Sequence, residues 1–99
     1  MNISKEKKGT DLTIALEGRL DTSTAPQLES ELRDALNGIE NLVFDLEKLV
    51  YVSSAGLRVF LATQKTMARQ GSMVIRNVQP DIMEIFEVTG FVDILTIEE

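Results

Sequence analysis

The stretch 42-LVFDLEKLVYVSSAGL-57 decides the fold of this 99-residue chain. Its first part, Leu42–Leu46, is almost continuously apolar, which predicts a central strand buried on both faces. Leu49–Val52 leads from that strand into a pair of serines. From Ser54 or Ala55 to about Gln70 the pattern becomes helical, with apolar residues at Leu57, Phe60, Leu61, Met67 and Ala68. A buried strand that leads directly into an amphipathic helix indicates an α/β fold with parallel strands.

Strands and helices also alternate on both sides of this stretch. Toward the N-terminus we expect strands at 2–7 and 12–16, then a helix that starts at a Thr24–Gln27 capping box and ends at Asn37-Gly38. Toward the C-terminus we expect a strand at 73–75, a helix from Pro80 to Gly90, and a last strand from Val92 to Ile97. The order β-β-α-β-α-β-α-β predicts an α/β fold. We expect a mixed sheet with helices packed mainly on one face, in a single domain over residues 1–99.

Charge and composition exclude several kinds of partner. The formal net charge is −6, which disfavours nucleic acid and anionic membranes because both are negatively charged. No apolar run approaches the roughly 20 residues that span a bilayer, so we expect no membrane insertion. The N-terminus shows basic residues without the apolar segment of a secretory signal. The absence of cysteine fits a reducing cytoplasm, which is where we expect the protein to act.

The residue types present also limit the chemistry. The chain contains neither His nor Cys, which excludes Ser-His-Asp and Cys-His nucleophiles and the usual zinc sites. A hydrolase nucleophile elbow requires G-x-S-x-G, but Val52 stands two residues before Ser54. The segment around Gly56 lacks the glycine spacing and the lysine of a phosphate-binding loop. We therefore expect no catalytic residue, metal or cofactor, although carboxylate or lysine chemistry remains formally open.

The segment Ser53-Ser54-Ala55-Gly56 is the strongest candidate for a functional site. A helix start presents free backbone N–H groups, and Ser53 or Ser54 can cap them. The small Ala55 and Gly56 would let a partner approach closely. A phosphoserine here would add about −1.5 to −2 charges at the positive end of the helix dipole. The alternative interpretation is that these serines only cap the helix.

Three segments together resemble the STAS domain family (sulfate transporter and anti-sigma factor antagonist). They are Gly18-Arg19-Leu20-Asp21-Thr22, the strand ending in Asp45-Leu46, and Tyr51-Val52-Ser53-Ser54-Ala55-Gly56-Leu57-Arg58. The resemblance covers essentially the whole chain and is nearest to the short bacterial anti-sigma factor antagonists. It implies partner switching. In that mechanism the unphosphorylated domain binds an anti-sigma factor that is also a serine kinase of the GHKL type, and this binding frees the sigma factor. Phosphorylation separates the two proteins, and a serine phosphatase resets the switch.

The resemblance also implies which residues act. The family pattern is often Asp-Ser-Ser/Thr-Gly-Leu, in which the serine after the aspartate is phosphorylated. Aligned on Gly56-Leu57, that serine is Ser54, while Ser53 replaces the aspartate and becomes an alternative acceptor. Asp21 matches a family position close to the phosphorylated serine. The residues implied in partner binding are Asp21, Thr22, Ser53, Ser54, Ala55, Gly56 and Arg58.

Two other functions stay open at this stage. The chain could be a STAS interaction subunit of another signalling or lipid-transport assembly, without phosphorylation. It could also be an enzyme that uses carboxylates, although no motif places a pair of acids. The target sigma factor and its stimulus are not encoded in these residues.

Overall fold

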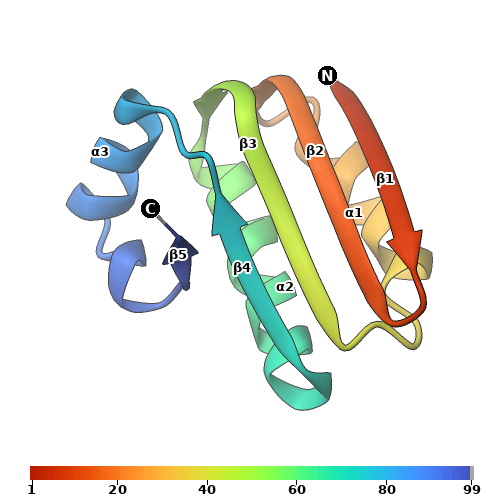
Figure 1. Cartoon of the computed structure of the whole chain (residues 1–99). Coiled ribbons are helices and arrows are strands. Elements are labelled where there is room, and N and C mark those ends of the chain that lie inside the picture. Colours follow the sequence, from red (N-terminus) through yellow and green to blue (C-terminus); the bar gives the residue numbers. More distant parts are fainter. Residues whose placement is uncertain (99) are drawn as a thin grey trace.

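The computed structural model describes residues 1–98, which form one mixed sheet with helices against it. The elements are β1 (Asn2–Lys8), β2 (Asp11–Leu20), α1 (Ala25–Ala35), β3 (Asn41–Val52), α2 (Ser54–Gln70), β4 (Ser72–Arg76), α3 (Pro80–Val88), the 3-10 turn η1 (Phe91–Asp93) and β5 (Ile97–Glu98). The strand order is β1-β2-β3-β4-β5, with β1 and β2 antiparallel and the other pairs parallel. This arrangement, shown in Figure 1, confirms the predicted α/β class and element order.

One face of the sheet forms the core, and the helices cover it. Side chains alternate along β3: Leu42, Phe44 and Leu46 are buried, whereas Val43 and Asp45 are only half-buried. The prediction of a strand buried on both faces is therefore wrong. Helices α1 and α2 both lie behind the sheet in Figure 1, which confirms that the helices pack mainly on one face. A long apolar run over-predicts burial here, because no helix layer within residues 1–98 covers the opposite face of the sheet.

Helix α2 is the central element of the core. Leu57, Phe60 and Met67 are buried as predicted, but Leu61 is half-buried and Ala68 is exposed. Val59 and Thr63 are buried on the same helix, so the buried stripe is displaced from the predicted one by about a residue. The ring of Phe60 packs edge-on against Phe44, with 5.2 Å between centroids, and against Phe86 of α3 at 6.2 Å. These aromatic contacts join the sheet, α2 and α3 into one core.

The last predicted strand, Val92–Ile97, is wrong in most of its length. Phe91–Asp93 forms the 3-10 turn, and only Ile97–Glu98 pairs with β4. The backbone N–H of Leu95 donates to the carbonyl of Phe91 at 2.8 Å, and the Leu95 side chain is buried. Val92 and Ile94 are exposed instead of alternating into the core. A single anchor residue after a turn thus replaces the expected strand.

Strand β3 is longer than its neighbour β2, and the difference is absorbed by two β-bulges. The register runs from Ala15↔Asp45 to Glu17↔Lys48, and again from Gly18↔Leu49 to Arg19↔Tyr51. Each step adds one extra residue on β3. Bulges twist a strand and redirect its side chains, and they are common beside functional sites. The second bulge lies directly before the Ser53-Ser54 segment.

Candidate functional site at the starts of α1 and α2

The starts of α1 and α2 lie together at one end of the sheet, where the carboxyl ends of β2 and β3 meet. Strands β2 and β3 are parallel neighbours, so their carboxyl ends lie together, with Leu20 opposite Val52. The backbone N–H of Ser53 donates to the carbonyl of Leu20 at 2.9 Å, which fixes the two following loops side by side. Ligands and partners of parallel α/β sheets commonly bind at the carboxyl ends of the strands. The fold therefore brings the Asp21 loop and the serine pair together, although Ser53 follows Asp21 by 32 positions in the sequence.

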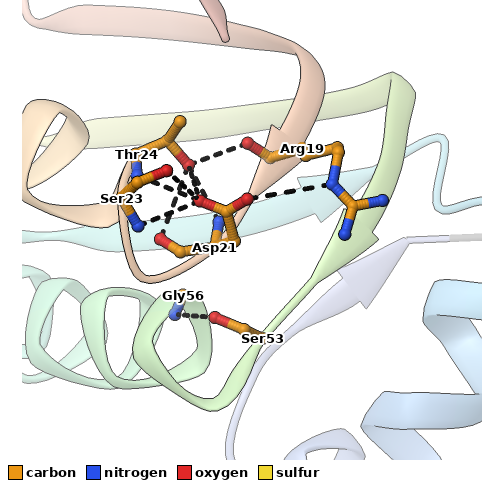
Figure 2. Close-up of polar contacts among 6 residues, drawn as sticks. All are labelled: Arg19, Asp21, Ser23, Thr24, Ser53 and Gly56. Atoms are coloured by element: carbon orange, nitrogen blue, oxygen red, sulfur yellow. Dashed lines mark hydrogen bonds and ion pairs between the residues drawn. The ribbon is translucent and has the colours of Figure 1, made fainter.

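Asp21 organises the loop between β2 and α1. Its Oδ1 accepts hydrogen bonds from the Ser23 N–H at 3.0 Å, the Ser23 hydroxyl at 2.8 Å and the Thr24 N–H at 3.1 Å. The Thr24 hydroxyl accepts from the Asp21 N–H at 2.8 Å and donates to the carbonyl of Arg19 at 2.8 Å. Figure 2 shows these contacts gathered around the Asp21 carboxylate. The result is a compact loop with little freedom to rearrange.

The capping box predicted for Thr24 and Gln27 does not form. The side chain of Thr24 makes no capping bond to the helix, because its hydroxyl is engaged with Asp21 and Arg19. The Gln27 amide instead lies 3.5 Å from the carbonyl oxygen of Met1. The Thr24–Gln27 spacing fits a capping box, but Asp21, three residues earlier, forms hydrogen bonds with Thr24 instead.

The Asp21 carboxylate is ionised at neutral pH. The hydrogen bond from the Ser23 hydroxyl holds the pKa of the Asp21 carboxyl below its usual value. Partial desolvation opposes this effect, and the N–H groups of Thr24 and Ser23 add to it. Hydrogen bonds to a carboxylate favour its charged form. The loop before α1 thus carries a fixed negative charge, and the bond from the Ser53 N–H to the Leu20 carbonyl joins this loop to the start of α2.

The two serines of the site have different environments. Ser53 is the N-cap of α2, is half-buried, and accepts a long hydrogen bond from the Gly56 N–H at 3.5 Å (Figure 2). The carbonyl of Ser53 accepts from the Leu57 N–H at 2.9 Å. Ser54 is the first residue of the helix, and it is exposed. The structure therefore separates a capping serine from a solvent-facing one.

Gly56 is buried, so the prediction that its small size lets a partner approach closely is wrong. A Cβ atom built on Gly56 would lie 2.7 Å from Leu20 Cγ and 2.8 Å from Val52 Cγ2. The missing side chain lets α2 approach the ends of β2 and β3, and does not open the helix to a partner. Ala55 is half-buried, whereas Thr22 and Arg58 are exposed like Ser54. The solvent-facing part of the implied set thus consists of Thr22, Ser54 and Arg58, with Asp21, Ser53 and Ala55 partly accessible.

The sequence analysis did not predict one contact at this end of the sheet, which is the contact between Arg19 and Tyr51. The guanidinium carbon of Arg19 lies 4.2 Å above the centroid of the Tyr51 ring, and Arg19 Nε lies 3.8 Å from Asp21 Oδ2. Each residue precedes the last residue of its strand, Leu20 or Val52. Pairing the carboxyl ends of two predicted parallel strands would have placed them together. The second bulge sets their register, and it could not be predicted from the sequence pattern.

Residues 1–98 contain no group of three or more acidic side chains arranged to hold a metal ion. Among these same residues, no helix is long and apolar enough to cross a membrane.

The STAS domain family model matches residues 2–99, so the chain belongs to the STAS family. BtrV of Bordetella bronchiseptica is 36% identical over 99 residues, covering 98% of this chain and 85% of BtrV. The anti-sigma-B factor antagonist of Listeria monocytogenes is 35% identical over 104 residues, covering 99% and 90%.

The fold also matches that of the anti-sigma factor antagonist SpoIIAA from Bacillus, which has been solved in two states. The unphosphorylated form gives a TM-score of 0.77 at 18% identity, covering 99% of this chain and 88% of SpoIIAA. The phosphorylated form gives a TM-score of 0.76 at 19% identity, covering 99% and 92%. Within the STAS family, the chain is therefore similar to proteins named as anti-sigma factor antagonists.

Proposed function

We propose that this protein is an anti-sigma factor antagonist controlled by phosphorylation of Ser54. Its unphosphorylated form binds an anti-sigma factor that is also a GHKL-type serine kinase, and binding releases the sigma factor in the cytoplasm. The observation that carries the proposal is the exposed hydroxyl of Ser54 at the start of α2, beside the ordered Asp21 loop. The names of the Listeria relative and of SpoIIAA support the same function.

The proposed switch has a simple chemical basis. The Ser54 oxygen attacks the γ-phosphorus of ATP, the bond to ADP breaks, and the hydroxyl proton passes to a base of the kinase. The new group carries about −1.5 to −2 charges and lies at the positive end of the α2 dipole, which favours it by roughly 0.3–1 kcal/mol. The domain therefore stays folded when modified. A serine phosphatase reverses the change.

The effect of the phosphate on binding comes from the charge and shape that it adds to the docking surface. Two like charges 4 Å apart repel by about 4 kcal/mol at an effective dielectric of 20, and by less when exposed. Each 1.4 kcal/mol changes affinity by roughly tenfold. A carboxylate of the partner placed against Ser54 would oppose a phosphate in the complex, whereas repulsion between Asp21 and the phosphate acts in the free protein as well. A loss of a few kcal/mol is enough to separate the proteins.

Ser54 is a better acceptor than Ser53 in this geometry. The oxygen of Ser53 is turned toward the Gly56 N–H as a helix cap, and its side chain is half-buried. The side chain of Ser54 is exposed and lies outside that capping bond. A kinase can reach Ser54 without unwinding the first turn of α2.

A phosphorylation assay tests the proposal. The anti-sigma factor kinase encoded nearest to this gene is incubated with the protein and ATP, and the modified residue is mapped by mass spectrometry. We expect one phosphoryl group on Ser54, lost in Ser54→Ala and retained in Ser53→Ala. Ser30→Ala, at an exposed serine of α1, is the matched control. Binding of the kinase without a phosphate on Ser53 or Ser54 would favour the alternative, a STAS interaction subunit that is not phosphorylated.

A further inference from the structure

An exposed patch of unusual composition lies beside the proposed switch. It consists of Arg19, Val50 and Tyr51, and we call it the strand-end patch. Val50 is 64% exposed and Tyr51 37%, which makes them two of the few large apolar side chains on the surface. The second bulge of β3 leaves Val50 without a partner on β2 and turns it outward. A strand that only served the core would have no need to present these side chains.

Arg19 is held in place within the patch. Its guanidinium stacks on the Tyr51 ring at 4.2 Å, and its Nε lies 3.8 Å from Asp21 Oδ2. Within residues 1–98 this long contact is the single ion pair of Arg19, and the other oxygen of Asp21 is occupied by Ser23 and Thr24. The guanidinium is therefore oriented by an aromatic ring while its side chain stays 61% exposed, and Figure 2 shows its Nε directed at Asp21.

The patch is continuous with the starts of the two helices. Tyr51 precedes Val52 and the capping residue Ser53, whose N–H is bonded to Leu20 at 2.9 Å. Asp21 then connects Arg19 to the loop before α1. A stable protein interface covers about 800 Å² on each partner, which is more than the first turn of one helix can supply. The docking surface must extend beyond Ser54, and the strand-end patch is the neighbouring surface with apolar and cationic character.

We infer that the strand-end patch is the second part of the surface that binds the anti-sigma factor. The expected counterpart is an apolar side chain seated on Val50 and Tyr51, next to a carboxylate that pairs with Arg19. Tyrosine and arginine are enriched among the residues that dominate binding energy, particularly when a rigid ring orients the charge. On a chain of net charge −6, one fixed guanidinium also selects for an acidic group at that place. This inference rests on the proposed function and adds the chemistry of the partner.

Isothermal titration calorimetry with the kinase used in the phosphorylation assay tests the inference. We expect Tyr51→Ala and Val50→Asp each to weaken binding by at least about tenfold, and Arg19→Gln by a similar or smaller factor. Tyr51→Phe keeps the ring under Arg19 and should bind within about twofold of the unmodified chain. Val88→Asp, at a valine of α3 that is 80% exposed, is the matched control and should leave binding unchanged. Circular dichroism and the melting temperature establish that each variant is folded.

The possible outcomes separate the inference from the proposed function. Unchanged affinity of folded Val50→Asp and Tyr51→Ala, while the unmodified chain binds, overturns the inference and leaves the proposed function intact. A loss with Val88→Asp as large as with Val50→Asp overturns it as well, because the effect would then be general to exposed valines. Absence of binding by the unmodified chain contradicts the proposed function and removes the basis of the inference with it.

Discussion

Asp21 does two things at the residue scale. Its Oδ1 closes the loop before α1 by accepting from Ser23 and Thr24, and its Oδ2 lies 3.8 Å from Arg19 Nε. The hydrogen bonds that shape the loop are also the ones that lower the pKa of Asp21. The carboxylate therefore contributes to stability and to the proposed electrostatics of the switch through the same contacts.

The lowered pKa of Asp21 predicts a pH dependence of stability. Because the folded pKa lies below the unfolded one, the stabilising contribution is complete above the unfolded value, close to 3.8, and is lost as the pH falls through the folded value. Asp21→Asn keeps an acceptor for the loop but has no charge. We expect this variant to be less stable than the unmodified chain at neutral pH, with the difference shrinking at pH values below 3.8.

Urea unfolding across that pH range measures the difference, with Asp34→Asn at an exposed position of α1 as the matched control. A difference between Asp21→Asn and the unmodified chain that stays constant down to the lowest pH would show that the charge of Asp21 does not stabilise the loop.

Ser53 and Ser54 should also differ in their effect on stability. Replacing a capping serine by alanine costs about 0.5–2 kcal/mol, and the long 3.5 Å bond of Ser53 places it at the low end. Ser54→Ala lies within the first turn at an exposed site and should change the free energy of unfolding by less than about 0.5 kcal/mol. Chemical denaturation of the two variants provides the comparison. A larger loss of stability for Ser54→Ala than for Ser53→Ala would contradict the assignment of Ser53 as the helix cap.

At the scale of elements, the connection from β3 to α2 shows what the sequence could and could not predict. The helix start at Ser54 follows from the serine pair and the apolar spacing after it, and it is confirmed. The two bulges of β3 and the burial of Gly56 were not predictable, because both depend on how β2 lies alongside. The exposed face of the sheet was missed for a related reason: an apolar run such as Leu42–Leu46 does not reveal how many helices will cover it.

Packing at the start of α2 predicts a strong coupling between Gly56 and Leu20. A methyl group on Gly56 would lie 2.7 Å from Leu20 Cγ, and Leu20 is fully buried. Overpacking costs about 1–3 kcal/mol, which exceeds the roughly 1 kcal/mol that alanine gains over glycine in a helix. We expect Gly56→Ala to be destabilising. Leu20→Ala alone should cost about 2–5 kcal/mol.

The double variant tests whether these two residues interact. Because Leu20→Ala removes two of the three atoms that the new methyl group would meet and leaves Val52 Cγ2, the combined loss should be at least about 0.5 kcal/mol smaller than the sum of the single losses. Denaturant unfolding of all four proteins measures this coupling. Strict additivity would mean that α2 does not rest on the end of β2 as described.

At the scale of the whole molecule, the edge-to-face contacts of Phe60 with Phe44 and Phe86 join the sheet to α2 and α3. Phe60 is fully buried between the other two rings. Phe60→Ala should lower stability by about 3–5 kcal/mol, a large share of the roughly 5–15 kcal/mol typical of a domain. Thermal unfolding measures the loss, and Phe91→Ala, at a half-buried ring of η1, should cost less. Equal losses would contradict the central position of Phe60.

The whole fold is also compatible with the switch that we propose. This chain matches the unphosphorylated and phosphorylated forms of SpoIIAA equally well, with TM-scores of 0.77 and 0.76. A control that acts without refolding needs a surface whose charge changes while its framework stays fixed. The ordered Asp21 loop and the α2 start held against Leu20 and Val52 would provide that framework.

The most direct test of the central claim compares one binding constant in two states. The protein is phosphorylated by its kinase, the modification on Ser54 is verified, and the affinity of the modified and unmodified forms for that kinase is measured by calorimetry at the same salt concentration. We expect the phosphorylated form to bind the kinase at least about tenfold more weakly, which corresponds to 1.4 kcal/mol or more. Equal affinity of the two forms, with phosphate on Ser54 and the fold intact, would contradict it.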